Sequence, residues 1–457
     1  MNFLTTWDFV FTALYVLIIF LIGRNHQKKK IKNDPVYKYY NAGLMMKIFG
    51  GIGVCIIYCF YYNGGDTIAY NEGNIAMVNL LFKSPETFFS ILLNNRSPEN
   101  WSMFDVSTTY PPTYMYRDTL AFSVIRFSSF FSLIGFKSLI PTTVIIAWIT
   151  YPGIWKLFKL FYGEFPDLKR SFAIAMLFIP SVVFWGSGLL KDAYTLSASA
   201  WMIYSFFCLI KKRERLFYHG IVIIISTYVL LSIKPYIFFS LLIGFLFVLT
   251  YMSVSKVKSA FLKFIIVPLL ILIIWGGGLV LFTIFGDFAG KNYSSFDNML
   301  EKASINQQDL SREYYGENTF DIGKFDPTVG GVLSKFFPAL NAGLFRPYIW
   351  ECSNPVMAIS GLENTMLMFF TMYVLFLSIL SFARIGLKKM FSTLFNHPLI
   401  VFSFFFGFSF AFMVGLTTAN FGALVRYKIP LIPFFLTSLF IVVYKFNRDK
   451  LDLKQKI

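Results

Sequence analysis

A carboxylate that directly follows two glycines is the first feature of the sequence able to take part in a reaction. It lies in the run Asn63-Gly64-Gly65-Asp66-Thr67, at the end of an apolar stretch. Glycine lets the backbone turn sharply, so we expect Asp66 at a membrane surface. There it could act as a general base for a hydroxyl, or hold a divalent ion that carries a phosphate. The alternative is structural, because an aspartate after glycine also suits the start of a helix.

A second polar turn combines glycines with a lysine and an aspartate. Lys191 and Asp192 follow Gly186-Ser187-Gly188, again at the end of an apolar stretch. We expect Lys191 to bind a lipid phosphate and Asp192 to orient it. The alternative is that Asp192 caps the next helix while Lys191 extends its long side chain to the membrane interface.

A third motif joins one arginine to aromatic residues and an acid. Arg346 has the planar guanidinium that binds phosphate through two hydrogen bonds. Tyr348, Trp350 and Glu351 follow it and are candidates for contact with a sugar. Two alternatives remain open: the aromatic residues belong to a membrane-interface belt, and Arg346 pairs with Glu351.

A fourth motif places two cations around a tyrosine, as Arg426-Tyr427-Lys428. By the charge pattern of the chain these residues lie outside the cytoplasm, where few cations are expected. They therefore call for an anionic partner, and a lipid phosphate or pyrophosphate would serve. The alternative is an ion pair with an acid of one of the earlier motifs.

The elements that must position these residues are membrane helices. The chain has 457 residues, of which 56% are hydrophobic, 20% aromatic and only 14% charged. Soluble domains are about 25% charged, and a soluble fold could not bury so much apolar surface, whereas a bilayer solvates it. We predict an all-α, polytopic transmembrane bundle that forms a single integral membrane domain over residues 1–457.

Basic clusters between the apolar runs give the orientation. The net charge of +17 is spread over short clusters rather than a separate basic domain, so we expect contact with the lipid bilayer and not with nucleic acid. The N-terminus is then outside, the C-terminus cytoplasmic, and the number of crossings about eleven. The predicted crossings are 9–23, 46–62, 140–158, 171–186, 194–210, 217–233, 236–252, 264–285, 361–382, 399–416 and 429–444.

Two long polar loops lie outside the cytoplasm in this topology, 63–118 and 286–355. The segment 119–140 is apolar enough to span, but a single crossing there would put every later basic cluster outside. We therefore expect it to be re-entrant, interfacial, or paired with a second crossing.

Several kinds of site are excluded by the sequence. No phosphate-binding loop of the Gly-rich Lys-Ser/Thr type occurs, so the chain encodes no ATP-driven pump. The three histidines, His26, His219 and His397, are scattered, and Cys55 and Cys59 lack further ligands. We expect no protein-built metal centre, while Mg or Mn brought with a substrate phosphate stays open as a cofactor.

Taken together, the acid of the first loop, the Ser-Gly-x-x-Lys-Asp turn and the run from Arg426 to Pro433 (Arg-Tyr-x-x-Pro-x-x-Pro) resemble the GT-C class of membrane glycosyltransferases and the Wzy-type polysaccharide polymerases. The resemblance implies transfer of a sugar or glycan from a polyprenyl phosphate or pyrophosphate carrier. It implies that Asp66 is the base or metal ligand and that Arg426 lies near the lipid phosphate. Where several members have two adjacent acids, this chain has Asp66-Thr67, which departs from a metal-dependent pattern.

The function expected from this resemblance is that of an enzyme of cell-envelope polysaccharide biosynthesis in the bacterial cytoplasmic membrane, with a polyprenyl-linked glycan as substrate and envelope biosynthesis proteins as partners. The alternatives are a transporter or flippase of lipid-linked glycans and a non-catalytic protein of envelope assembly. A transporter should carry polar residues near the middle of several helices, whereas the predicted charges gather at helix ends.

Overall fold

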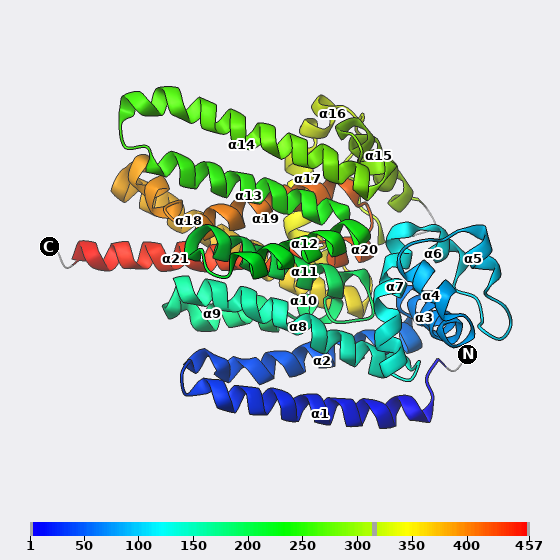
Figure 1. Cartoon of the computed structure of the whole chain (residues 1–457). Coiled ribbons are helices and arrows are strands. Elements are labelled where there is room, and N and C mark those ends of the chain that lie inside the picture. Colours follow the sequence, from blue (N-terminus) through cyan, green and yellow to red (C-terminus); the bar gives the residue numbers. More distant parts are fainter. Residues whose placement is uncertain (1–2, 313–317, 455–457) are drawn as a thin grey trace. The chain divides into compact units, whose positions relative to one another are not determined.

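The regular structure in the described residues, 3–312 and 318–454, is helical throughout (Figure 1). This computed structural model confirms the prediction of an all-α, polytopic bundle. The chain forms two compact units. Unit 1 contains Met1–Leu160 and Met176–Lys234, and unit 2 contains Phe161–Ala175 and Pro235–Ile457. The assignment of residues 1–457 to a single membrane domain stays a prediction.

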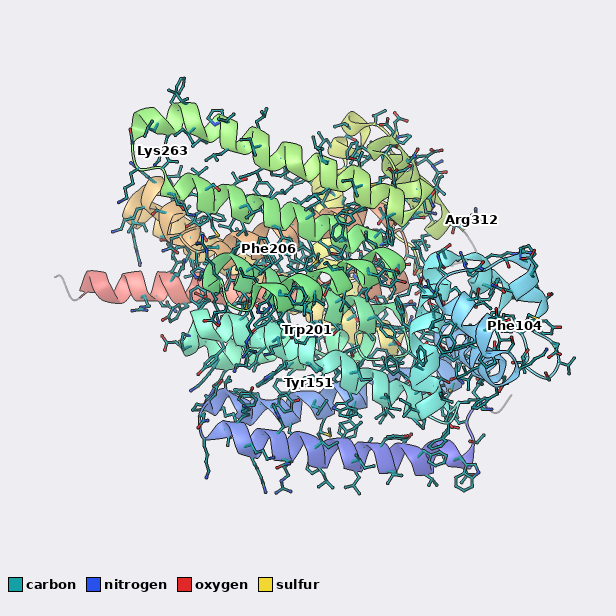
Figure 2. All side chains as sticks on the ribbon, in the orientation of Figure 1. Phe104, Tyr151, Trp201, Phe206, Lys263 and Arg312 are labelled. Atoms are coloured by element: carbon teal, nitrogen blue, oxygen red, sulfur yellow. The ribbon has the colours of Figure 1, made fainter. Side chains whose placement is uncertain are left out.

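Unit 1 is built around α2, α7 and α11. Its helices are α1 (Thr6–Ile31), η1 (Pro35–Tyr39), α2 (Tyr40–Ile56), η2 (Ile57–Tyr61), α3 (Asp66–Lys83), α4 (Pro85–Leu92), α5 (Pro98–Ser102), α6 (Thr113–Arg117), α7 (Thr119–Ile134), most of α8 (Leu139–Glu164), α10 (Pro180–Trp185), α11 (Lys191–Phe207), η5 (Cys208–Lys212) and α12 (Leu216–Ile233). Helix α2 packs against α1 and α10, α3 against α7, and α11 against α12. Aromatic side chains such as Tyr151 and Trp201, labelled in Figure 2, belong to the helices of this unit.

Unit 2 is built around α19, which packs against α13, α17 and α21. Its interior is rich in phenylalanine, since Phe402, Phe406 and Phe410 of α19 are fully buried. Its elements are the end of α8, η3 (Pro166–Leu168), α9 (Lys169–Ala173), α13 (Pro235–Lys256), α14 (Ala260–Ala289), η6 (Lys291–Tyr293), α15 (Phe296–Leu310), α16 (Val329–Ser334), α17 (Phe336–Phe345), η8 (Ile349–Glu351), α18 (Pro355–Leu394), α19 (Pro398–Thr417), α20 (Phe421–Tyr427) and α21 (Ile432–Lys454). The π-helical η4 (Ile174–Phe178) crosses the boundary between the units in sequence.

Among the described residues, nine helices are long and apolar enough to cross a membrane, which defines a multi-pass membrane protein. A tenth crossing results if α20 and α21, which meet at a bend of 64°, form one broken span. About eleven were expected. The difference lies at 171–186, where α9, η4 and α10 replace one continuous helix, because Pro180 has no N–H to continue the hydrogen-bond ladder.

The segment 119–140 contains α7, an apolar helix of 16 residues. At 1.5 Å per residue such a helix is about 24 Å long, shorter than the roughly 30 Å of a hydrocarbon core. Its interior-facing side is polar as well as apolar, with Arg126, Ser128 and Ser129 all buried. This length is compatible with the expected interfacial or re-entrant segment, which stays a prediction.

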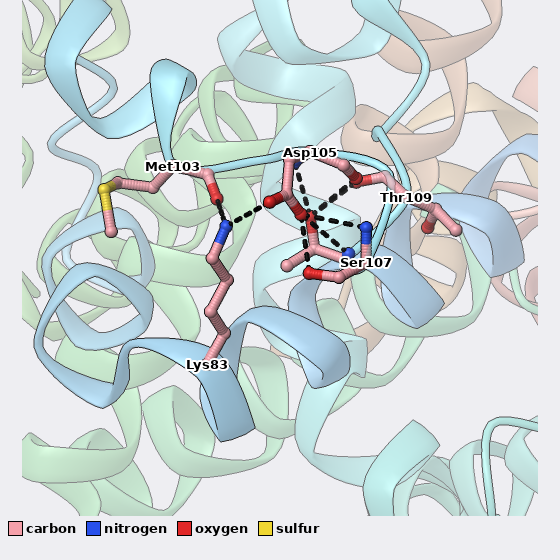
Figure 3. Close-up of polar contacts among 6 residues, drawn as sticks. Lys83, Met103, Asp105, Ser107 and Thr109 are labelled. Carbon is pink, nitrogen blue, oxygen red and sulfur yellow. Dashed lines mark hydrogen bonds and ion pairs between the residues drawn. The ribbon is translucent and has the colours of Figure 1, made fainter.

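The first polar loop, 63–118, is folded into helices α3 to α6 and locked by a lysine. Lys83, the last residue of α3, donates from Nζ to the carbonyl of Met103 (3.0 Å) and to the carboxylate of Asp105 (2.7 Å), as Figure 3 shows. The other carboxylate oxygen of Asp105 accepts from the backbone and hydroxyl of Ser107 and from the backbone of Thr108. These bonds join the end of α3 to residues 103–108, which lead toward α6.

Loss of this lysine should loosen the loop in a pH-dependent way. The bond from Lys83, followed by those from Ser107 and Thr108, holds the pKa of Asp105 well below its ordinary value of 3.8. A depressed pKa contributes stability that is present above pH 3.8 and is lost as the pH falls below it. We expect Lys83→Met to raise hydrogen exchange in 98–110 at pH 7 and to flatten its dependence on pH. The measurement is exchange mass spectrometry between pH 2 and 7, corrected for intrinsic rates.

The matched control is Lys137→Met, since Lys137 bonds to the neutral amide of Asn79 (3.1 Å) in the same unit. That variant should keep the pH dependence of the wild type. Equal protection and an equal pH profile in Lys83→Met and wild type would show that the lysine does not lock the loop.

Candidate functional site

The turn that carries Asp66 is built from residues in unusual backbone conformations. Asn63, Gly64 and Gly65 all have positive φ values, 51°, 146° and 92°. A Cβ on Gly65 would also meet the Tyr58 ring at 3.0 Å, so this position requires glycine for two reasons. The turn ends α2 with its π-helical extension and starts α3 with Asp66, whose side chain is half-buried.

The second motif packs directly beside this turn. The hydroxyl of Thr67 donates to the carbonyl of Leu189 (3.4 Å), and both residues are fully buried. Gly188 lies so close to Val54 that a Cβ would clash with its side chain. The helix start that carries Asp66 and the helix start that carries Lys191 are therefore neighbours within unit 1.

A buried lysine of α2 is hydrogen-bonded to the start of the second motif. Lys47 of α2 is 6% exposed and donates from Nζ to the carbonyl of Gly186 (2.5 Å). It lines a cavity of about 20 Å³, enough for one water molecule. This lysine fixes the point at which α10 ends and the turn toward Lys191 begins.

Lys191 and Asp192 each form an ion pair with an oppositely charged residue from a distant part of the chain. Lys191 faces Asp118, with 3.8 Å between Nζ and the carboxylate, and both side chains are partly accessible. Asp118 also accepts from the backbone N–H of Leu120 (2.9 Å) and so caps α7. Asp192 pairs with Lys234 at 2.5 Å, and this pair is almost fully buried. The orientation of Lys191 by Asp192 stays a prediction.

A tyrosine connects Asp66 to the first polar loop. Partial burial, followed by the charges of Asp66 and Glu72, raises the pKa of Tyr114, which places its phenol within electrostatic range of Asp66. Tyr114 and Asp118 lie at opposite ends of the single turn α6. Asp66, Tyr114, Asp118 and Lys191 thus form one group of polar residues in unit 1.

Two arginines that were not predicted lie close to this group. Arg96 donates to the carbonyl of Tyr116 and to the hydroxyl of Thr119, both at 2.5 Å. Burial lowers the pKa of Arg96, and the nearby Arg126 adds to this lowering. Arg126 is 3% exposed and donates to the carbonyl of Leu92 (2.7 Å). The region around the start of α7 is therefore rich in cations.

The chemistry open to this group follows from its charges and helix ends. Gly65 and Leu190, which precede α3 and α11, have no polar side chain with which to cap the helices. Backbone N–H groups at a helix start, reinforced by a lysine, bind anions such as phosphate. A carboxylate beside such a site can take a proton from a hydroxyl. The group therefore combines what is needed to bind a phosphate ester and to activate an alcohol.

The third motif forms a separate arrangement in unit 2. Arg346 and Glu351 make a two-pronged ion pair, with contacts of 2.6 and 2.9 Å to one carboxylate oxygen. Thus the alternative left open by the sequence, a mutual ion pair, is present. The guanidinium also lies over the rings of Phe320 and Phe421, at 4.7 and 5.2 Å from their centroids. Its binding to phosphate stays a prediction, and it requires that the phosphate compete with or join Glu351.

Tyr348 and Trp350 stack on each other, with ring centroids 4.8 Å apart and planes 16° apart. Trp350 is 66% exposed. An exposed, nearly parallel pair of rings offers a flat apolar surface. Contact of these rings with a sugar stays a prediction.

The fourth motif marks the break between α20 and α21. Lys428 ends α20 and is buried, with its Nζ donating to the carbonyls of Arg346 (2.8 Å) and Leu344 (3.4 Å). It therefore ties the fourth motif to the third. Arg426 and Tyr427 are half-buried in the last turn of α20. Glu363, an acid within α18 that was not predicted, lies within electrostatic range of Lys428.

No cluster of three or more histidine, cysteine, aspartate or glutamate side chains that could hold a metal ion occurs in residues 3–312 and 318–454. A divalent ion brought by a substrate phosphate stays a prediction. No protein-family model, curated protein or solved structure matches the chain. The fold itself defines the class, a multi-pass α-helical membrane protein.

Proposed function

We propose that this membrane protein transfers a sugar or glycan from a polyprenyl phosphate or pyrophosphate carrier, as a membrane glycosyltransferase or polysaccharide polymerase. One observation carries the proposal: the bond between Thr67 and Leu189 makes neighbours of two helix starts, one bearing Asp66 and the other Lys191. A base and an anion-binding helix end are the two groups that such a transfer needs. A lipid carrier brings the activated sugar, so no nucleotide-binding domain is required.

The proposed reaction is a displacement that inverts the anomeric carbon. The carboxylate of Asp66 takes the proton of an acceptor hydroxyl, and the oxygen attacks the anomeric carbon of the donor. The bond between that carbon and the phosphate oxygen breaks, and its electron pair stays on the phosphate. Lys191 and the first N–H groups of α11 stabilise the charge that develops there. Asp118 and the buried Asp192–Lys234 pair position Lys191 and the start of α11.

The residues of unit 2 stay in the proposal as predicted contacts to the lipid phosphate and the sugar. Arg346, Arg426 and Lys428 would bind the lipid phosphate, with Tyr427 beside them. Tyr348, Trp350 and Glu351 would contact the sugar. The site would face the outer leaflet of a bacterial cytoplasmic membrane, with the C-terminus in the cytoplasm and envelope biosynthesis proteins as partners.

A transporter or flippase of lipid-linked glycans is the second candidate, and Lys47 favours it. This lysine is buried within a membrane-spanning helix, beside a small cavity. Charges at such depth often mark a substrate path. Its hydrogen bond to Gly186 supports a positioning role for the turn before Lys191. We therefore rank glycan transfer before transport.

The test is transfer from a short-chain polyprenyl pyrophosphate-linked oligosaccharide by the purified chain in nanodiscs. We expect Lys191→Gln to lower the rate roughly 10²-fold, the usual effect of removing one group that stabilises a developing anion. Lys137→Gln, at an exposed lysine of the same unit, should keep the wild-type rate. Wild-type chain that moves the lipid across liposomes but forms no new glycosidic bond would replace transfer by transport.

A further inference from the structure

The first polar loop carries three amphipathic aromatic rings, of which Trp101 is half-buried. Trp101, Tyr110 and Tyr114 belong to the first polar loop, and we call them the first-loop aromatic surface. Tyr110 is 52% exposed and Tyr114 is 64% exposed. Each of the three rings has an apolar face together with one O–H or N–H at its edge.

Ring contacts and a short stiff segment join this surface to the polar group around Asp66. Trp101 contacts Tyr110 with ring centroids 6.1 Å apart, and it rests on the buried ring of Tyr116 at 4.6 Å. Two prolines, residues 111 and 112, follow Tyr110 and stiffen the path to α6, which carries Tyr114. Asp118 directly follows α6 and lies 3.8 Å from Lys191, so Tyr114 belongs to the same part of unit 1 as the proposed base.

Aromatic residues continue on the other side of the Asp66 turn. Tyr61, the last residue of η2, and Tyr62 are 49% and 46% exposed, and their rings lie 5.1 Å apart. Two exposed tyrosines thus precede the Asp66 turn in sequence. Rigid amphipathic rings give a large contact area at little cost in conformational entropy.

The same loop also carries exposed polar side chains. Glu99, Ser102, Ser107 and Thr109 are all exposed. Asp105 keeps an accessible carboxylate even while it bonds to Lys83. A sugar ring presents C–H groups on its faces and hydroxyls at its rim, so it matches a flat ring bordered by hydrogen-bonding groups. A lipid tail would find no partner for those polar groups.

We propose that the first-loop aromatic surface binds the sugar rings of an oligosaccharide and leads one of its hydroxyls to Asp66. The inference rests on the proposed function, because it assigns the acceptor side of that reaction to these rings. Glycan length then matters, since a longer acceptor reaches more rings.

Binding can be measured without any transfer reaction. Saturation-transfer NMR on the full chain in nanodiscs, with maltohexaose and chitohexaose as probes, should show transfer to sugar C–H protons for at least one of them. We expect Tyr110→Ala and Trp101→Ala each to raise the Kd about tenfold, the effect of losing one ring contact. Trp7→Ala, at a tryptophan of α1 that is 63% exposed, is the matched control and should bind like the wild type.

Tyr110 is the more informative site, because Trp101 packs on buried rings and its loss could disturb the loop. Hydrogen exchange of the loop in each variant separates the two effects. No saturation transfer to either probe, or equal Kd values for wild type and a well-folded Tyr110→Ala, would overturn the proposal.

The competing occupant is the membrane interface, where Trp and Tyr also gather. A fluorophore attached at Val106→Cys, a position 91% exposed, reports on this. Quenching by aqueous iodide supports the glycan surface, and quenching by spin-labelled lipid overturns it. Oligosaccharide binding that depends on Tyr110, in a chain without transfer activity, would reject the proposed function and keep this inference. Transfer activity that is unchanged in Tyr110→Ala and Trp101→Ala would support the proposed function and reject this inference.

Discussion

Asp66→Asn is expected to lower glycan transfer by roughly 10² to 10⁴-fold, the range found for removal of a general base. The amide has nearly the shape of the carboxylate but cannot accept the proton of the acceptor hydroxyl. The Gly64–Gly65 turn and the bond from Thr67 to Leu189 do not involve this side chain's charge, so the fold should persist. The measurement is the initial rate of transfer in nanodiscs, with thermal unfolding as the test of folding.

Glu72→Gln is the control for Asp66→Asn. Glu72 is an exposed acid on the same helix, and it also lies within electrostatic range of Tyr114. Its neutralisation should change the rate by less than threefold or so, because it does not stand at the helix start. A fully active Asp66→Asn chain, or equal losses in both variants, would remove Asp66 from the proposed mechanism.

The helical fold could be read from composition, since long apolar runs separated by basic clusters allow few other solutions. The interruption of the helix predicted at 171–186 could not be predicted from composition. Mean hydropathy there is that of a membrane helix, but Pro180 divides the stretch into short helical pieces. A proline also stands at the break between α20 and α21, since the residues that separate the two helices, Lys428–Leu431, contain Pro430.

The candidate site was only partly visible in the sequence. Gly64 and Gly65 pointed to Asp66, and the glycines before Lys191 pointed to the second turn. Asp118 and Lys234 were not singled out, because each stands at the end of a helix where charged residues are ordinary. Their partners, Lys191 and Asp192, come from distant parts of the chain. Only the three-dimensional packing pairs them.

Two buried cations could have been recognised in the sequence, although averaging the hydropathy over a window conceals them. Lys47 and Arg126 each stand inside an apolar run, where a charge is expensive unless it has partners. In the structure both donate to backbone carbonyls, of Gly186 and Leu92. In both cases the cation in an apolar run donates to a carbonyl at the C-terminal end of a neighbouring helix, α10 or α4. Both helix ends lie in unit 1.

Lys234→Met is expected to be the most destabilising of the changes considered for unit 1. It removes the ammonium 2.5 Å from Asp192 and leaves that carboxylate buried, since the two side chains are 5% and 0% exposed. Loss of one partner of a buried ion pair lowers the free energy of unfolding by about 3–5 kcal/mol. Asp192→Asn combined with Lys234→Met should recover much of this loss, because no charge is then left buried. The measurement is unfolding by denaturing detergent, followed in the wild type and in both variants.

Lys191→Met provides the contrast that separates stability from chemistry. Its pair with Asp118 has a distance of 3.8 Å and is partly exposed, so its loss should change the free energy of unfolding by about 1 kcal/mol or less. If the proposed mechanism holds, this variant is stable and nearly inactive, whereas Lys234→Met is unstable and the double variant regains stability. A stable Lys234→Met chain, or a double variant no more stable than the single one, would mean that a stranded Asp192 carboxylate is not what destabilises the protein.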